Sequence, residues 1–189
     1  MTLTPQAVLD FWFSLKSPGK KDDARVQEAL RPAYDHAAAG ELDIWADDPR
    51  ERMALTLLLD QIPRHLFRDD PRTYATDAKA QELTARFIEH GDWAGFAPLE
   101  RFYCAMPWLH AEDLPRQLAI NPIYHQVAPQ IAGLEFMSRI ADLYLETIRR
   151  FGRFPHRNSI LGRDTTPEEA TFVKEEWGPR RRRVIEGEA

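Results

Sequence analysis

Apolar residues recur along most of the chain at steps of three and four, the spacing that gathers side chains on one face of an α-helix. The clearest run lies within residues 130–151 and consists of Ile131, Leu134, Met137, Ile140, Ala141, Tyr144 and Ile148. Similar spacing predicts helices after Thr4, from about Asp23 to Gly40, and over about 72–90. Strand-like alternation and Asn-Gly hairpin signals are missing, so the sequence predicts an all-α protein.

Local signals set the expected helix ends. Thr4-Pro5, Asp48-Pro49 and Thr166-Pro167 each place a capping side chain before a proline, a pattern typical of helix starts. Gly152 is expected to end the helix over 130–151. The segment after Pro49 is apolar almost all round and should be central to the core. It should end near Gln61 or Ile62, because Pro63 disfavours the α conformation of the preceding residue.

Size and charge limit the classes of function. The 189 residues are enough for one sizeable core, so we expect a single helical domain over 1–178. The remainder, 179–189, is expected to be a basic, disordered tail because it contains four consecutive arginines, Arg180 to Arg183. The net charge of −5 argues against a general nucleic-acid partner and gives no reason to expect an anionic membrane surface.

Cysteine usage and hydropathy suggest where the protein works. Cys104 is the single cysteine and lies in an apolar run, so it is expected to be a core residue. An intrachain disulfide is excluded, which fits a reducing compartment. No apolar run approaches the ~20 residues of a membrane span, and no signal peptide is visible. These features predict a cytoplasmic protein without a membrane partner, and they leave the oligomeric state open.

Three polar segments are unusual for plain connections between helices. The first follows the most apolar helix and contains Asp60, Gln61, Arg64 and Arg68; the second contains His110 and Glu112. The third, after Gly152, contains Arg153, His156, Arg157, Asn158 and Arg163. Charged groups at the edge of a core must be paired or must face a wet cavity. All three segments are therefore candidate parts of a site, provided that they meet in space.

These segments also resemble a known family. Leu59-Asp60-Gln61-Ile62-Pro63-Arg64, His110-Ala111-Glu112-Asp113, Arg150-Phe151-Gly152-Arg153-Phe154-Pro155-His156-Arg157-Asn158 and Thr166-Pro167-Glu168-Glu169 are similar to motifs of the bacterial domain-of-unknown-function family 924. The similarity extends to Val8-Leu9-Asp10-Phe11-Trp12-Phe13 and so spans nearly the whole chain. It implies antiparallel helix pairs in a tetratricopeptide-like right-handed superhelix, and it implies no reaction.

The residue types favour the binding of an anion. Guanidinium groups match carboxylate and phosphate, so Arg64, Arg153, Arg157 and Arg163 are expected to pair with the ligand's charge. His156 and Asn158 would orient the ligand. Asp60 and Gln61 would fix the positions of the arginines on the side away from the ligand. The expected partner is an anionic small molecule or an acidic peptide.

Two alternatives remain open. The protein could be a small hydrolase or lyase without a cofactor, in which His110 and His156 act as acid and base and Asp60 or Glu112 orients the imidazole. It could instead be a structural or docking protein whose polar residues form a buried network. No metal site is expected, because no two histidines form a tight His-x-x-x-His pair. No glycine-rich phosphate loop is present either.

Overall fold

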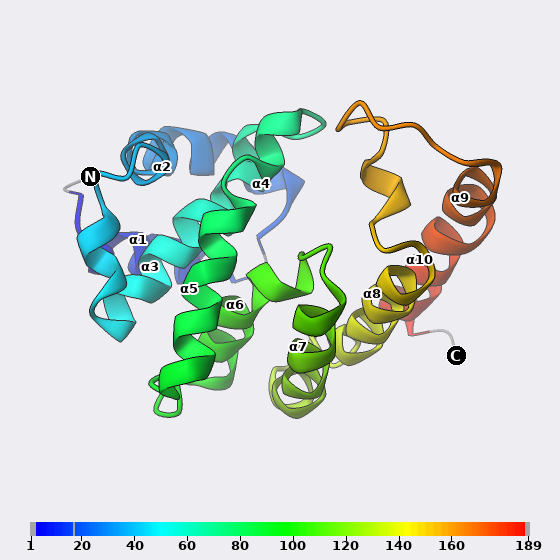
Figure 1. Ribbon diagram of the computed structural model, residues 1–189. Coiled ribbons are helices and arrows are strands. Elements are labelled where there is room, and N and C mark those ends of the chain that lie inside the picture. The colour runs from blue at the N-terminus through cyan, green and yellow to red at the C-terminus, as the bar shows by residue number, and fades with distance from the viewer. Residues whose placement is uncertain (1–2, 17, 188–189) are drawn as a thin grey trace. The chain divides into compact units, whose positions relative to one another are not determined.

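The computed structural model describes residues 3–16 and 18–187, and these contain helices and no strand (Figure 1). The prediction of an all-α protein is confirmed. The chain packs as two compact units, Met1–Phe96 and Ala97–Ala189. The single domain predicted over 1–178 stays a prediction, because two compact units can belong to one domain. None of the described helices is long and apolar enough to span a lipid bilayer.

The N-terminal unit is organised around one buried helix, α3. Its helices are α1 (Pro5–Ser14), α2 (Asp23–Ala38), α3 (Pro49–Asp60), α4 (Ile62–Leu66) and α5 (Asp77–His90). Short 3₁₀ turns lie at Lys20–Asp22, Asp43–Ala46 and Pro71–Tyr74. Helix α3 contacts α1, α2, α4 and α5. Every residue of α3 from Arg52 to Asp60 is buried, as its nearly continuous apolar sequence predicts.

The ends of α3 follow from its sequence. The Asp48 carboxylate accepts hydrogen bonds from the backbone N–H groups of Arg50 and Glu51, at 2.8 and 3.1 Å. The helix ends at Asp60, and α4 begins two residues later. The end of α3 is thus close to the predicted one near Gln61 or Ile62, but Pro63 does not keep Ile62 out of the α conformation, because Ile62 is the first residue of α4. Asp60 is the last residue of a buried helix.

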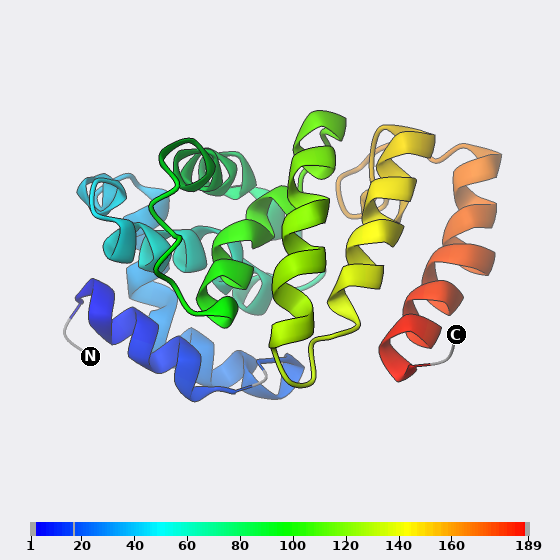
Figure 2. The ribbon, with the colours of Figure 1, turned by 90° about the horizontal axis from the view of Figure 1, so that it is seen from below.

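The C-terminal unit is a series of helices that pack on their neighbours in the sequence. They are α6 (Pro98–Leu109), α7 (Leu114–Val127), α8 (Met137–Phe151), α9 (Pro167–Thr171) and α10 (Gly178–Glu186). Short 3₁₀ turns lie at Ala128–Gln130 and Pro155–Arg157. Helix α7 contacts α6 and α8, and α8 contacts α10. Figure 2 shows α7, α8 and the α9–α10 segment side by side in a row.

Several helix boundaries differ from the sequence-based expectation. The helix predicted over 130–151 begins only at Met137, after a turn in which Gly133 has a φ of 80°. The segment over 72–90 starts as a 3₁₀ turn, and α5 itself begins at Asp77. Pro107 lies inside α6, which continues to Leu109. It has no N–H to donate to the Tyr103 carbonyl, four residues earlier, so one helical hydrogen bond is missing near the end of α6.

The segment expected to be a disordered tail is helical as far as it is described. Residues 178–186 form α10, and residues 188 and 189 lie outside the described residues. Arg180 binds Glu146 of α8 through two contacts of 2.8 and 2.6 Å. Arg139 donates a hydrogen bond to the Val184 carbonyl. These bonds to α8 stabilise a helix that the run of arginines alone would not predict.

A π-helical turn, Phe172–Trp177, joins α9 to α10. The proline two residues further on, Pro179, has no N–H, and its ring crowds the carbonyl four residues earlier in a regular α-helix. A wider turn relieves that contact, and π turns are frequent at functional sites. Trp177 at its end packs in a cluster with Phe154 and Phe172.

Gly152 ends α8 in the left-handed conformation, with a φ of 67°. We predict that Gly152→Ala lowers the free energy of unfolding by about 1 kcal/mol, because a Cβ is unfavourable at this φ. Gly152→Asn should lose less, since asparagine tolerates that region. Thermal denaturation compares the three proteins, and equal stability of Gly152→Ala and the wild type would contradict the assignment.

Candidate functional site

The predicted site residues fall into the two compact units. Asp60, Gln61, Arg64 and Arg68 belong to the N-terminal unit; His110, Glu112, Arg153, His156, Arg157, Asn158 and Arg163 belong to the C-terminal unit. The structure brings residues together within each unit, as described below. That the two groups meet each other stays a prediction.

In the N-terminal unit, Arg64 lies between two carboxylates. Its Nη2 is 3.1 Å from Asp77 Oδ1, and its Nη1 is 3.4 Å from Asp60 Oδ1. Burial opposes the charge of the guanidinium, but Asp60 and Asp77 outweigh it and raise the pKa of Arg64. Gln61 donates a hydrogen bond to Asp60 Oδ2. Asp60, Gln61 and Arg64 are thus neighbours, as the sequence predicts, and Arg64 is already paired.

Arg68 takes another direction. It binds Asp23, the first residue of α2, through contacts of 3.0 and 2.8 Å. His65 Nδ1 lies 2.8 Å from the same carboxylate. The hydrogen bond from Arg68 is the largest cause of the lowered pKa of Asp23. Arg68, two residues after the end of α4, therefore links this segment to α2. No local sequence pattern indicates a partner 45 residues away.

In the C-terminal unit, hydrogen bonds from Gln117 of α7 hold the turn that contains His110 and Glu112. The fully buried Gln117 amide donates hydrogen bonds to the carbonyl groups of Leu109 and Ala111, at 2.7 and 2.9 Å. Asp113 caps α7 by accepting a hydrogen bond from the Arg116 N–H at 2.8 Å. The turn is therefore held at both ends.

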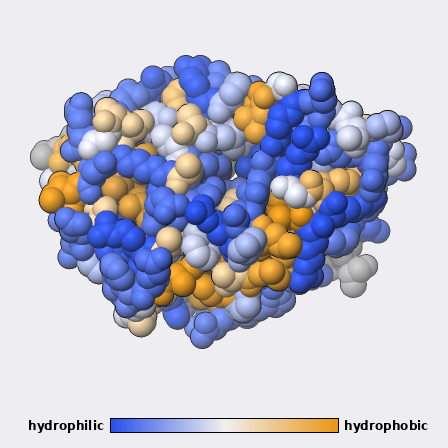
Figure 3. Space-filling view, in the orientation of Figure 1, coloured by the Kyte–Doolittle hydropathy of each residue, from blue (hydrophilic) through white to orange (hydrophobic). Residues whose placement is uncertain are grey.

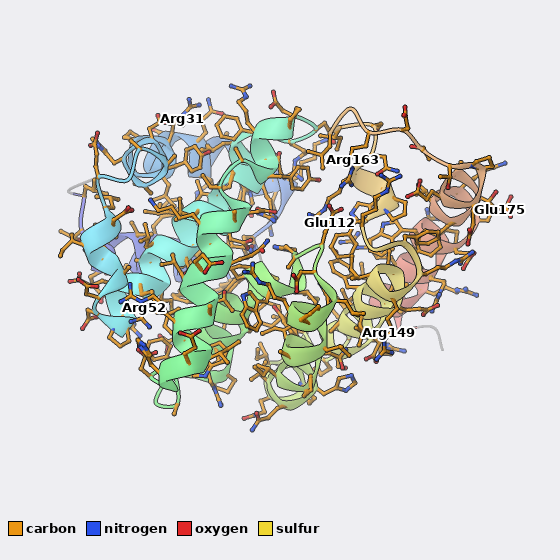
Figure 4. The ribbon with its side chains drawn as sticks, in the orientation of Figure 1. Arg31, Arg52, Glu112, Arg149, Arg163 and Glu175 are labelled. Carbon is orange, nitrogen blue, oxygen red and sulfur yellow. The ribbon has the colours of Figure 1, made fainter. Side chains whose placement is uncertain are left out.

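Glu112 binds the third polar segment through Arg163. Arg163 Nη1 is 2.6 Å from Glu112 Oε2, and Nη2 is 3.0 Å from Oε1 (Figure 4). The Phe154 N–H donates to Oε1 at 2.7 Å, and Arg163 donates to the Phe154 carbonyl. Burial favours the neutral acid, but Arg163 and the Phe154 N–H outweigh it and lower the pKa of Glu112.

A second carboxylate, Glu169 of α9, holds the other end of this segment. Arg153 binds it at 2.7 and 2.9 Å, and the Asn158 amide donates to Oε2 at 3.3 Å. Glu169 also closes a capping box with Thr166. The hydrogen bonds from Arg153 are the largest cause of the low pKa of Glu169, about 2. Glu169 was not among the predicted site residues, and in the sequence it stands only in the Thr166-Pro167-Glu168-Glu169 motif, where nothing local indicates Arg153 as its partner.

These contacts balance the charges of four of the arginines in the predicted segments, Arg64, Arg68, Arg153 and Arg163. Each binds a carboxylate of its own unit. Their first role is therefore to position the polar segments, and a role in ligand binding stays a prediction.

His156 stacks on Trp177, a residue that sequence analysis did not select. The rings are 4.3 Å apart and nearly parallel, at 11°. The His156 Nδ1 atom is buried and has no hydrogen-bond partner in the described part of the chain. Burial lowers the pKa of His156 to about 3, with further contributions from Arg157, Arg181, Arg163 and His110. His156 is therefore neutral at pH 7 and lies near several basic groups.

Arg157 is buried in the same region, with 6% of its surface exposed. Its guanidinium carbon lies 4.5 Å from the centre of the Phe154 ring. The influence of Arg157, Arg163 and His110 on His156 means that the C-terminal unit brings these predicted site residues together.

A pocket lies beside this basic region. It has a volume of about 340 Å³ and is lined by Trp177, Gly178, Arg181, Arg182 and Ile185. Among the described residues, no carboxylate forms an ion pair with Arg181 or Arg182. Arg181, Arg182 and Ile185 belong to the expected tail over 179–189 and were not among the predicted site residues. No group of acidic, histidine and cysteine side chains in 3–16 and 18–187 is arranged to hold a metal ion.

Comparison with known proteins gives a family and no activity. The family described as "Bacterial protein of unknown function (DUF924)" matches residues 6–176. A solved structure of the protein of unknown function ATU0120 from Agrobacterium tumefaciens is similar, with a TM-score of 0.80 and 32% identity. The match covers 90% of this chain and 97% of that one. No curated protein matches the chain.

The low pKa of Glu169 predicts a pH dependence of stability. A carboxylate whose pKa is lower in the folded state stabilises the fold above its ordinary pKa of 4.5, and this contribution is lost as the pH falls towards about 2. We expect Glu169→Gln to be less stable than the wild type at pH 7 and to lose less stability on acidification. Melting temperatures measured from pH 7 to pH ~2 test this. Parallel curves for the two proteins would contradict it.

The pair between Glu112 and Arg163 predicts strong energetic coupling. Arg163→Met should lower the free energy of unfolding by about 2 kcal/mol, because it leaves the half-buried Glu112 carboxylate without its cation. Glu112→Gln in the same chain should restore part of the loss. Urea unfolding of both single variants and the double variant measures the coupling. Additive losses would mean that the pair does not hold the segment in place.

Proposed function

We propose that this chain, which belongs to the bacterial DUF924 family of proteins of unknown function, is a binding protein for an anionic small molecule or an acidic peptide. The ligand would bind to the C-terminal unit at the pocket beside Trp177. One observation carries the proposal: Arg181 and Arg182 line that pocket without a carboxylate partner among the described residues.

The surroundings of the pocket support this assignment. Free guanidinium groups are good donors to carboxylate and phosphate, and they bind such groups through two hydrogen bonds at once. Arg181 also lies near His156, which itself lies near Arg157 and Arg163. The local field therefore favours an anion, although the whole chain has a net charge of −5.

The other predicted residues have supporting roles in this proposal. Arg153 and Arg163 would position the segment around His156 through Glu169 and Glu112. His156, as a neutral imidazole, would keep Trp177 in place at the rim of the pocket. In this role Arg153 and Arg163 keep their present ion pairs, so their side chains do not have to move when the ligand binds.

The alternative of a cofactor-independent hydrolase or lyase with His110 and His156 as acid and base has less support. A general acid or base is most effective when its pKa is near the working pH. The pKa of His156, about 3, makes it a weak base and leaves very little of the acid form at neutral pH.

A structural role is the second candidate, and the carboxylate pairs favour it. Glu112 and Glu169 each hold two segments together through several hydrogen bonds. In that case the polar residues would contribute stability and no ligand would bind. The two candidates differ in what they predict for Arg181, which belongs to none of these pairs.

We also propose that the helix pairs wind as a tetratricopeptide-like right-handed superhelix and that the protein works in the cytoplasm. Packing of α7 against both of its sequence neighbours, α6 and α8, supports the first point. The lone buried Cys104 supports the second, because a reducing compartment keeps such a thiol free.

The binding proposal predicts that Arg181→Ala loses affinity for small anions. Citrate and inorganic phosphate should bind the wild type and quench or shift the fluorescence of Trp177, and Arg181→Ala should weaken binding about tenfold. Binding should also weaken as salt is added, since the contact is with exposed charges. Isothermal titration calorimetry measures both effects.

Arg149→Ala is the matched control, because Arg149 is an exposed arginine of α8 outside the pocket (Figure 4). It should bind citrate as the wild type does. Equal weakening in both variants, or no binding to any of the proteins, would reject the anion site and leave the structural role.

A further inference from the structure

We infer that the pocket on α10 is a docking site for an acidic amphipathic helix of a partner protein. This inference rests on the proposed function and names the ligand of the same site. Four of the lining residues, Gly178, Arg181, Arg182 and Ile185, stand at positions i, i+3, i+4 and i+7 of one helix. Such a set of four forms the hole that receives a side chain of a facing helix in knobs-into-holes packing.

The length of the pocket fits a helix better than a compact anion. From Trp177 to Ile185 the helix rises roughly 12 Å, which is about two turns of a facing helix. A single phosphate or carboxylate would contact only the two arginines. It would leave the Ile185 side chain, which is 43% exposed, without a partner. The volume of about 340 Å³ lies at the lower end of the range for small-molecule pockets.

Gly178 opens the floor of this hole. A Cβ at Gly178 would meet only the Val173 carbonyl oxygen, at 3.9 Å, so a side chain would fit there. Its φ of −61° is ordinary for a helix. Glycine in a helix costs about 1 kcal/mol relative to alanine, and nothing in the local backbone requires it here. A side chain of a partner that approaches closely at this position would explain why residue 178 is a glycine.

The charge of the pocket favours an acidic helix of another protein over a second copy of this chain. Arg181 and Arg182 lie in the middle of the hole, whereas Arg180 is already bound to Glu146. A second copy that packed its α10 against this one would bring arginines against arginines, which is unfavourable. A helix with an apolar side chain for the hole and Glu or Asp on either side would pair with both arginines instead.

Three of the residues that line the pocket, Arg181, Arg182 and Ile185, are exposed on α10. This helix follows α8 at the end of the row of helices in Figure 2, and α8 is the helix it packs against. Among the described residues, those that line the pocket are Trp177 and four residues of α10. They combine two arginines with the apolar Ile185 and Trp177, and a mixture of charged and apolar groups is typical of a reversible interface. Figure 3 shows that hydrophilic and apolar areas also alternate on the face of the molecule in view.

The test uses a designed, fluorescently labelled peptide of about 18 residues, five helical turns, with Leu at the a and d positions and Glu beside them. A matched peptide has Lys in place of each Glu. Fluorescence anisotropy should show binding of the Glu peptide to the whole chain and none of the Lys peptide. The helical circular dichroism signal of the mixture should exceed the sum of the separate signals.

Two variants address the hole itself. Gly178→Leu fills it without straining the backbone, and Arg181→Glu reverses its charge; each should weaken binding of the Glu peptide about tenfold or more. Gly95→Leu and Arg149→Glu are the controls, because a Cβ at Gly95 meets open space and Arg149 lies outside the pocket. Both controls should bind as the wild type does, and thermal melts should confirm that all variants are folded.

Other outcomes overturn the inference in recognisable ways. If citrate binds with dependence on Arg181 but the Glu peptide does not bind, the proposed function stands and the helix partner is wrong. If Gly178→Leu binds the peptide as tightly as the wild type, the hole is not the docking site. If the wild type forms a dimer in light scattering and Gly178→Leu is a monomer, the occupant is a second copy. If neither citrate nor the peptide binds, both proposals fail.

Discussion

The C-terminal unit depends on a simple constraint: a carboxylate removed from water must find a cation or several N–H donors. Glu112 meets this need with Arg163 and the Phe154 N–H, and Glu169 meets it with Arg153 and Asn158. Removing one partner of such a pair leaves an uncompensated charge, so the pairs hold firmly although their net contribution to stability is modest. Together they attach the irregular segment after Gly152 to the turn after α6 and to α9. The same segment carries His156, which stacks on Trp177.

The same constraint changes what the arginines mean. In the sequence the arginines of the polar segments suggest a positively charged site. In the structure most of those in the polar segments face a carboxylate, and the opposite charges cancel over a few ångströms. What remains in the described part of the chain is Arg181 and Arg182 on α10, which line the pocket without a carboxylate partner. A search for a site that counts arginines would therefore select the scaffold, whereas one that counts uncompensated arginines selects the pocket.

Local patterns predicted much of the fold and little of the site. The starts at Pro5, Pro49 and Pro167 and the stop at Gly152 were correct, because caps, prolines and glycines act within one turn of where they stand. The apolar spacing over 130–151 predicted a helix that begins too early, because this spacing does not indicate the turn at Gly133. Partners such as Glu112 and Arg163 are 51 residues apart, and no local pattern reports a pairing of that kind. The helical tail was missed for the same reason, because Glu146 stabilises it from another helix.

A local patch of charge can act against the net charge of the protein, because salt at physiological ionic strength screens interactions between exposed charges that are more than about 8 Å apart. An anion close to the pocket therefore responds mainly to the charges beside it, which include Arg181 and Arg182. The apolar groups at the two ends of the pocket, Trp177 and Ile185, add attraction that a small inorganic ion cannot use. Charge would thus bring many anions to α10, and shape would decide which of them stays. Since the hole at Gly178 has the spacing of helix packing, the ligand that we propose offers carboxylates and an apolar side chain at helical spacing.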